Sequence, residues 1–180
     1  MITMSDLSQA LMDCGALQFG EFTLASGAKS DYYIDIKKAS TNPKVLYLIS
    51  QLMAETMQIK NIRPDRIAGV VLGSVPLAAA LSLATGIPYI MIRKEKKDHG
   101  TGKLIEGDLN PGEKVLVVED VITTAGSSIK AIHTLRENGA IVENVISVID
   151  REGGGRENLE EIGVAFNPLV KASDLVRERK

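Results

Sequence analysis

Several stretches of this chain are rich in Val, Ile and Leu without alternating polar residues, and they constrain its fold more than any other feature. The apolar stretches are 66–72, 87–92, 115–118 and 141–149, and the helical patterns between them are 76–85 and 127–138. Strands of that composition fit a parallel sheet that helices cover on both faces. We therefore predict an α/β fold with an open, mainly parallel sheet, in which ligands bind at the carboxyl ends of the strands.

The first forty residues or so do not follow this alternation. A helical pattern follows Ser5-Asp6, which we expect to be its N-terminal cap. Short strands at 21–24 and 32–36 flank a turn that contains glycine. Asn42-Pro43 then predicts the start of a longer helix, because proline is favoured at the first helical position.

Composition narrows the classes of protein to consider. A chain of 180 residues with a net charge of −2 fits one domain, 1–180, and argues against a general nucleic-acid or membrane-surface binder. No apolar run reaches membrane-spanning length. Cys14 is the only cysteine, so no intrachain disulfide can form, and a reducing cytoplasm fits. His99 and His133 are too widely separated to predict a zinc site.

The segment 115–127 has the form of a ligand-binding junction between a strand and a helix. Four apolar residues lead into Glu119 and Asp120, and the loop Thr123 to Ser127 precedes a helical pattern. Amides of such a loop can point at phosphate oxygens, which the helix dipole also favours. The two acids can accept hydrogen bonds from the vicinal hydroxyls of a ribose. A junction that binds nothing, with Ser127 as a simple helix cap, is the alternative.

A long charged loop, 93–107, lies between two predicted strands. Its cationic residues are Arg93, Lys94, Lys96, Lys97, His99 and Lys103. A loop of this length in a compact domain is often an active-site lid, and its cations could neutralise an anionic leaving group. A solvated surface loop is the alternative. The Gly-Thr-Gly-Lys within it does not make a nucleotide P-loop, because Lys97 and Leu104 stand where that pattern needs glycine and a hydroxyl.

The segment 115–127 resembles the ribose-phosphate loop of the type I phosphoribosyltransferases, which use phosphoribosyl pyrophosphate (PRPP). Three further segments, 19–33, 93–100 and 148–154, are similar to the hood, the catalytic loop and the last core segment of the orotate-using members of that family. The likeness covers nearly the whole chain. It implies the type I phosphoribosyltransferase fold, with a mainly parallel central sheet flanked by helices and a small N-terminal hood, roughly 1–40, on a core of 41–180.

The resemblance implies transfer of the ribose 5-phosphate of PRPP to orotate. The products would be orotidine 5′-monophosphate and pyrophosphate, in pyrimidine biosynthesis. Mg²⁺ would be carried by PRPP, with no direct ligation by side chains. The resemblance also implies a cytoplasmic homodimer whose active sites are shared, because the charged loop of one subunit covers the site of its neighbour. Neither nucleic acid nor a membrane is an expected partner.

Individual residues acquire roles through the same resemblance. The implied PRPP-binding residues belong to the charged loop, the acid pair and the loop after it: Arg93, Lys94, Lys97, His99, Glu119, Asp120, Val121, Ile122, Thr123, Thr124, Ala125, Gly126 and Ser127. Lys97 and Asp120 are the implied catalytic residues. Thr123, Arg151 and Lys29 are implied to bind orotate, and a guanidinium suits this anionic base.

Three positions depart from the pattern of familiar relatives. Bacterial members carry lysines where this chain has Ala25 and Gly73, and many relatives have glycine in place of Ala125. Gly73-Ser74 would form a small-residue loop near the pyrophosphate. We therefore expect a variant subgroup in which one or two cationic contacts are missing or supplied differently.

Two alternative functions are weighed beside this expectation. A phosphoribosyltransferase for another base would use adenine, guanine or xanthine, and the hood segment and Arg151 argue against it. A regulator that binds PRPP and DNA would usually carry an added helix-turn-helix segment. The residues before the first long helix match the hood instead.

Overall fold

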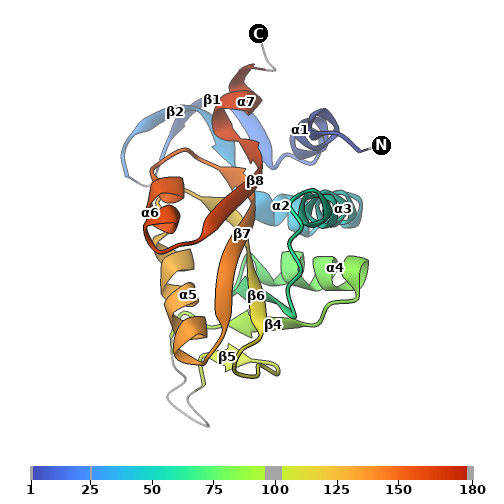
Figure 1. The fold of residues 1–180 in the computed structure, drawn as a ribbon. Coiled ribbons are helices and arrows are strands. Elements are labelled where there is room, and N and C mark those ends of the chain that lie inside the picture. The colour runs from blue at the N-terminus through green and yellow to red at the C-terminus, as the bar shows by residue number, and fades with distance from the viewer. Residues whose placement is uncertain (1, 25, 96–102, 178–180) are drawn as a thin grey trace.

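A computed structural model of the chain describes residues 2–24, 26–95 and 103–177. Six strands form one sheet in the order β5-β4-β3-β6-β7-β8 (Figure 1). They are β3 (Arg66–Val70), β4 (Tyr89–Ile92), β5 (Ile105–Glu106), β6 (Lys114–Ile122), β7 (Ile141–Asp150) and β8 (Ala165–Lys171). Neighbouring strands run parallel except β4 and β5, which are antiparallel. The predicted α/β fold with a mainly parallel sheet is confirmed.

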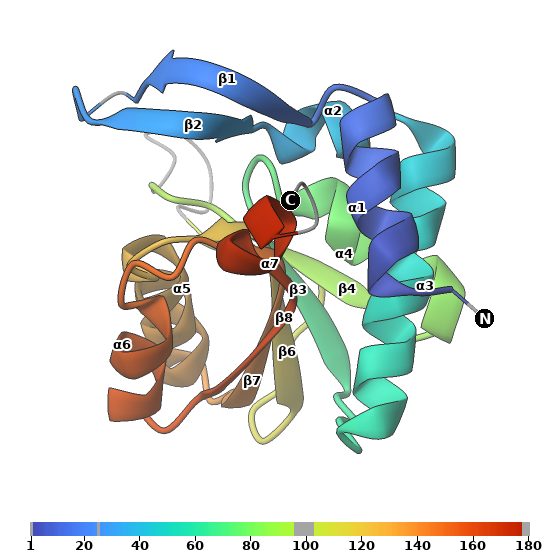
Figure 2. The same ribbon diagram turned by 90° about the horizontal axis from the view of Figure 1, so that it is seen from above.

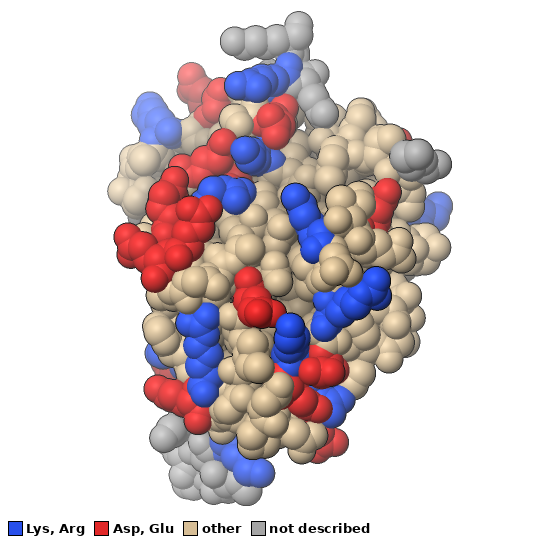
Figure 3. All heavy atoms as spheres, viewed as in Figure 1, with Lys and Arg blue, Asp and Glu red and all other residues tan. Residues whose placement is uncertain are grey.

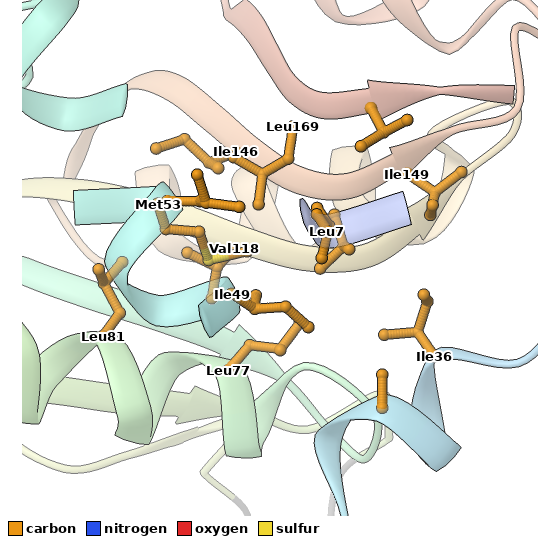
Figure 4. Close-up of a cluster of buried hydrophobic side chains, with 14 of the residues drawn as sticks. Leu7, Ile36, Ile49, Met53, Leu77, Leu81, Val118, Ile146, Ile149 and Leu169 are labelled. Carbon is orange, nitrogen blue, oxygen red and sulfur yellow. The ribbon is translucent and has the colours of Figure 1, made fainter. Parts of the chain in front are cut away.

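Helices cover both faces of this sheet, as Figure 1 shows. On one side lie α3 (Pro43–Ile59) and α4 (Val75–Thr85), and on the other lie α5 (Gly126–Glu137) and α6 (Gly155–Glu161). Val118 of β6 packs beside Ile49 and Leu77 of the first pair (Figure 4), whereas its neighbour Val117 packs in the cluster that contains Leu135 of α5. Successive side chains of a strand point to opposite faces, which is why the central strands are apolar throughout.

The N-terminal part forms the expected small unit beside the sheet. It contains α1 (Met4–Asp13), β1 (Leu17–Thr23), β2 (Lys29–Ile34) and α2 (Ile36–Ser40). The strands β1 and β2 pair antiparallel, and Figure 2 shows their hairpin reaching over the rest of the fold from a base beside α1 and α2. At that base Leu17 and Ile34 are buried, whereas Lys29 at the outer end is exposed.

Local capping corrects two of the predicted boundaries in this region. The cap of α1 is Thr3 rather than Ser5-Asp6, because the Thr3 hydroxyl accepts a bond from Asp6 N at 3.2 Å. Asp6 completes the capping box by accepting from Thr3 N at 2.7 Å. Ile36, predicted to end a strand, begins α2, since the Asp35 side chain caps that helix at Lys37 N. Pro43 begins α3 as predicted.

Other elements differ from the prediction in extent or were not predicted. The strand β6 continues to Ile122, so Glu119 and Asp120 lie within it and not after it. The short β5 lies in the charged loop, and α6, β8 and α7 (Ala172–Arg177) follow β7. Pairing explains the greater length of β6, because it stays in register with β7 as far as Ile122 and Asp150 although its apolar run ends at Val118.

Charges of both signs cover the face seen in Figure 3, where acidic side chains gather over α6. That helix contributes Glu157, Glu160 and Glu161. No helix in the described part of the chain is both long and apolar enough to cross a membrane.

Candidate active site

The candidate site lies at the edge where four parallel strands end. The loops that follow β3, β4, β6 and β7 begin at Val71, Arg93, Thr123 and Arg151. Because β3 pairs with β4 and β6, and β6 pairs with β7, these four loops leave the sheet side by side. The sequence motifs meet at this edge as predicted.

The loop between β6 and α5 has the features of a phosphate cradle. The carbonyl oxygens of Thr123 and Thr124 accept hydrogen bonds from Gly155 N and Asn158 Nδ2 at the start of α6, both at 2.9 Å. A Cβ on Gly155 would lie 2.5 Å from Ile122 Cγ2, so only glycine permits this close approach. These bonds hold the loop carbonyls toward α6. The N–H groups in the first turn of α5 have no carbonyl acceptor four residues earlier within the helix. They are therefore suited to bind an anion.

Ala125 occupies the turn where many relatives have glycine. Its φ of 66° lies in the left-handed region, and its side chain is buried. An L-residue with a Cβ adopts this conformation at a cost of roughly 1–2 kcal/mol. Ala125 O nevertheless accepts from Ile129 N at 2.8 Å, so the alanine still starts α5 at the position expected for the glycine.

The two acids of β6 occupy different environments. Glu119 is 6% exposed, and both of its oxygens accept hydrogen bonds from buried serines. Ser74 Oγ donates to Oε2 at 2.8 Å, and Ser128 Oγ donates to Oε1 at 2.9 Å. The pKa of Glu119 is raised to about 7, chiefly by burial and also by the nearby Asp120, although the two serines and Lys94 act in the opposite direction.

Asp120 is half-buried and lies against the loop that follows β3. One of its oxygens accepts from Val121 N at 2.8 Å. A Cβ on Gly73 would lie only 2.6 Å from the other oxygen. The glycine at 73 therefore leaves room for the Asp120 carboxylate, and a longer side chain there would displace one of them. This contact gives a physical reason for the absence of lysine at position 73.

The cationic residues of the predicted lid are placed only in part. Arg93 Nε donates to Glu106 Oε1 at 2.8 Å, and Arg93 N donates to Leu104 O at 2.7 Å. Lys94 lies near enough to act on the pKa of Glu119. Lys97 and His99 lie outside the described residues, as do Lys96 and Ala25.

A small cavity of about 30 Å³ opens beside the cradle. Arg93, Lys94 and Ser127 line it, together with Lys130 of α5. The motifs did not single out Lys130, which joins the predicted cations Arg93 and Lys94 there. Its spacing from Ser127 was the available signal, because residues three apart share one helix face.

The residues predicted to bind the base lie on the sheet and on the hood. The Arg151 guanidinium carbon lies 5.5 Å from the ring centroid of Tyr32, a residue of β2. Lys29, also on β2, lies three residues away and lines a separate hollow with Phe22 and Asp31. The structure thus joins Arg151 to the hood through Tyr32, whose role the sequence left undecided.

Hydrogen bonds fix the backbone on both sides of Arg151. Arg151 N donates to Ile122 O at 2.8 Å, and the buried Asp150 accepts from Glu152 N at 2.7 Å. Glu152 in turn accepts from Ser173 N and Ser173 Oγ at 2.9 and 3.0 Å. These bonds hold the backbone that carries Arg151 against β6 and α7.

Comparison with known proteins agrees with this geometry. A protein-family model described as the phosphoribosyl transferase domain matches residues 36–165. The chain is 52% identical to the orotate phosphoribosyltransferase of Pyrococcus abyssi over 94% of its own length and 93% of that protein. It is 48% identical to the orotate phosphoribosyltransferase of Methanocaldococcus jannaschii, over 95% and 96% of the two chains.

Solved structures show the same likeness. The crystal structure of orotate phosphoribosyltransferase from Aeropyrum pernix superposes with a TM-score of 0.86 at 33% identity, covering 96% of this chain and 97% of that one. A crystal structure of the Mycobacterium tuberculosis orotate phosphoribosyltransferase in complex with PRPP gives a TM-score of 0.79 at 30% identity, over 96% and 98% of the two chains.

Proposed function

Because the chain belongs to the phosphoribosyl transferase domain family, among its orotate phosphoribosyltransferases, we propose a role for each part of the site in that reaction. The enzyme transfers the ribose 5-phosphate of PRPP to orotate and releases pyrophosphate, a step of pyrimidine biosynthesis. The transition state resembles a ribose oxocarbenium ion, so the work of the protein is positioning and electrostatics.

The junction of β6 and α5 is the observation that carries the proposal. The 5-phosphate binds the amides of 123–127 at the N-terminus of α5. Asp120, with its half-exposed carboxylate, accepts from a ribose hydroxyl and favours the positive charge that develops on the sugar. Glu119 lies deeper, with both oxygens already engaged by serines, which limits its direct contact with the ribose.

The leaving pyrophosphate binds between the loop 71–74 and the cations. Arg93, Lys94 and Lys130 neutralise its growing charge from the side of the cavity they line. Lys97 and His99 keep their predicted place in this group, with Lys97 as the catalytic cation. Mg²⁺ would reach the site on the oxygens of PRPP, since this ion is typically bound through substrate phosphates. When bound, it supplies positive charge to the pyrophosphate.

Orotate binds next to Arg151 and Thr123. The Arg151 guanidinium offers paired donors to the carboxylate of the base, and the Tyr32 ring supports its face. Lys29, which lies on β2, either contacts orotate directly or acts on it from the neighbouring hollow that Lys29 lines. The guanidinium beside the Tyr32 ring is the observation that favours orotate over a purine.

A homodimer with shared active sites completes the proposal. The helix α4, with the sequence VPLAAALSLAT, is apolar on all sides, which is typical of a helix that is covered all round. In the single chain Leu83 of α4 is 89% exposed, and Leu72 just before the helix is 72% exposed. A second subunit would cover this face. The single, half-buried Cys14 is compatible with the cytoplasmic location that we also propose.

One assay tests the proposed activity. The purified protein with PRPP and Mg²⁺ should consume orotate, measured as the loss of its ultraviolet absorbance. Parallel reactions contain adenine, guanine or xanthine in place of orotate. Turnover of a purine alone would identify a purine enzyme, and PRPP binding without any turnover would favour the regulator.

Subunit mixing tests the shared site. Lys97→Ala subunits and Asp120→Asn subunits are each expected to be nearly inactive as homodimers. Mixed dimers contain one site in which both substituted residues are wild type, so activity should partly return. No recovery after demonstrated subunit exchange would contradict donation of the loop between subunits.

A further inference from the structure

We propose that Glu152, held by Ser173 of α7, is a positioning residue that fixes the Arg151 guanidinium in the base subsite. The inference rests on the proposed function, in which Arg151 binds orotate. Ser173 N donates to Glu152 Oε2 at 2.9 Å, and Ser173 Oγ donates to Oε1 at 3.0 Å. The helix α7 lies beyond the residues that the family model matches, so this contact would give the C-terminal segment a part in binding the base.

The pairing of β7 with β8 brings the start of α7 next to Arg151. Asp150 is the last residue of β7, and it lies opposite Lys171, the last residue of β8. Because the two strands run parallel, the chain leaves both of them at the same edge of the sheet. Figure 1 shows α7 at this end of β8. The segments after the two strands are therefore close enough for direct contact.

The helix α7 provides a fixed point for this contact. Its Ala172 and Leu175 are buried, and Leu175 packs in the same apolar cluster as Ile149 of β7. Glu152 is exposed, yet its bonds to Ser173 tie it to this anchored helix. The bond from Ser173 N, above all, holds the pKa of the Glu152 carboxyl below its usual range. A carboxylate that accepts such bonds is held more firmly than a neutral acceptor.

The backbone at Glu152 has a conformation that needs support from its surroundings. Its φ of 58° lies in the left-handed region, which is unfavourable for a residue with a Cβ. Such residues persist where several contacts over-determine them, and they are common at functional sites. Glu152 N donates to the buried Asp150 at 2.7 Å, and the side chain accepts from Ser173. Main chain and side chain together thus fix the residue that follows Arg151.

Separate bonds join the same loop to the phosphate half of the site. Gly155 N donates to Thr123 O at 2.9 Å, and Arg151 N donates to Ile122 O at 2.8 Å. Neither bond involves the Glu152 side chain, so both should remain when that side chain is replaced. Loss of the side chain should therefore change orotate binding more than PRPP binding.

Steady-state kinetics of the full-length enzyme with orotate, PRPP and Mg²⁺ tests the proposal. Glu152→Ala should raise the KM for orotate about three- to tenfold, because a misplaced guanidinium binds the base less well. The KM for PRPP should change by less than about twofold. Ser173→Ala keeps the amide donor and should raise the KM for orotate only about twofold. An unchanged KM for orotate in Glu152→Ala, or an equal rise in both KM values, would overturn the proposal.

Glu152→Gly separates positioning from stability. Glycine adopts a φ of 58° without strain, so this variant should have a higher Tm than Glu152→Ala. It also lacks the carboxylate, so its KM for orotate should rise as much as in Glu152→Ala. Glu152→Gln keeps an acceptor for Ser173 N and should stay within about twofold of wild type. A KM for orotate that follows Tm across these variants would show a purely structural contact and contradict the proposal.

A double-mutant cycle shows whether the effect passes through Arg151. Arg151→Ala should raise the KM for orotate strongly, and adding Glu152→Ala should then change it little further. A fully additive rise would contradict the proposal. A wild type without orotate turnover would contradict the proposed function instead, an outcome distinct from those of the variants.

Asp6→Ala is the matched control for Glu152→Ala. Asp6 is also an exposed acid that accepts from the amide and the hydroxyl of one residue, Thr3, both at 2.7 Å. It caps α1 and has no bond to the loop after β7. Its replacement should leave both KM values unchanged. A rise in the KM for orotate equal to that of Glu152→Ala would mean that the effect is not specific to the Ser173 contact, and the proposal would fail.

Discussion

The proposed ribose-phosphate half of the site is held by buried groups within the sheet, whereas the proposed base half depends on a hairpin that extends away from the sheet. In the first half, Glu119, Ser74 and Ser128 are buried and bonded to one another. In the second half, Arg151 is fixed from the core side but meets the hood through the ring of Tyr32. The comparison shows that buried hydrogen bonds hold the first half, whereas one ring contact joins the second half to the hood.

Replacement of Asp120 should lower activity the most of the changes to the phosphate half of the site. Asp120→Asn keeps the shape of the side chain and removes the charge that faces the developing cation. We expect kcat to fall roughly 100- to 1000-fold, as for the loss of one preorganised electrostatic contact. Steady-state kinetics measures this effect. Thermal unfolding should change little, because the carboxylate is only half-buried.

Asp65→Asn is the matched control for that prediction. Asp65 accepts from Lys114 N at 2.8 Å at the opposite end of the sheet, far from the strand ends that form the site. Its replacement should leave kcat unchanged. Equal losses in both variants would mean that Asp120 acts through stability and not through charge.

Gly73→Ala should disturb the same carboxylate without changing any charge. The added Cβ would lie 2.6 Å from Asp120 Oδ2, so the carboxylate must shift. A displaced catalytic group should lower kcat/KM by about 10- to 100-fold. If Gly73→Ala acts through Asp120, it should lower kcat/KM little further in an Asp120→Asn background. An equally large loss of kcat/KM in that background would show that Gly73→Ala acts in another way.

The sequence was sufficient to predict the strands and loops that surround the site, but not the side-chain contacts within it. The apolar strands, the loop 123–127 and the glycine-ended helices predicted the sheet and the edge where ligands bind. The burial of Glu119 could not be predicted, because it depends on serines of two other elements and on β6 extending past its apolar run. The Tyr32 contact to Arg151 likewise joins residues that only the folded hood brings together. Long-range pairings of this kind leave no local pattern.

The buried acid of the phosphate half should also reveal itself in the pH dependence of stability. The pKa of Glu119 is raised to about 7 in the folded protein from its ordinary value of 4.5. The folded state therefore binds more protons than the unfolded state between these values, and its stability falls as the pH rises from about 4.5 through 7. Glu119→Gln removes this slope.

Denaturant titrations across that pH range measure the difference. The free energy of unfolding of wild type, relative to Glu119→Gln, should decline by on the order of 2 kcal/mol between pH 5 and about 8. Parallel curves for the two proteins would show that Glu119 is not protonated in the folded state at low pH within this range.

A substitution in the base half should have a smaller effect, and it should change the KM for orotate and not kcat. Tyr32→Leu removes the ring that faces Arg151 but keeps an apolar side chain, and a cation–π contact of about 0.5–1 kcal/mol corresponds to roughly two- to fivefold. The KM for orotate should rise by that factor while the KM for PRPP stays constant. Tyr32→Phe keeps the ring and should match wild type. A rise in the KM for PRPP instead would mean that the hood positions the phosphate half too, and the two halves would then not be independent.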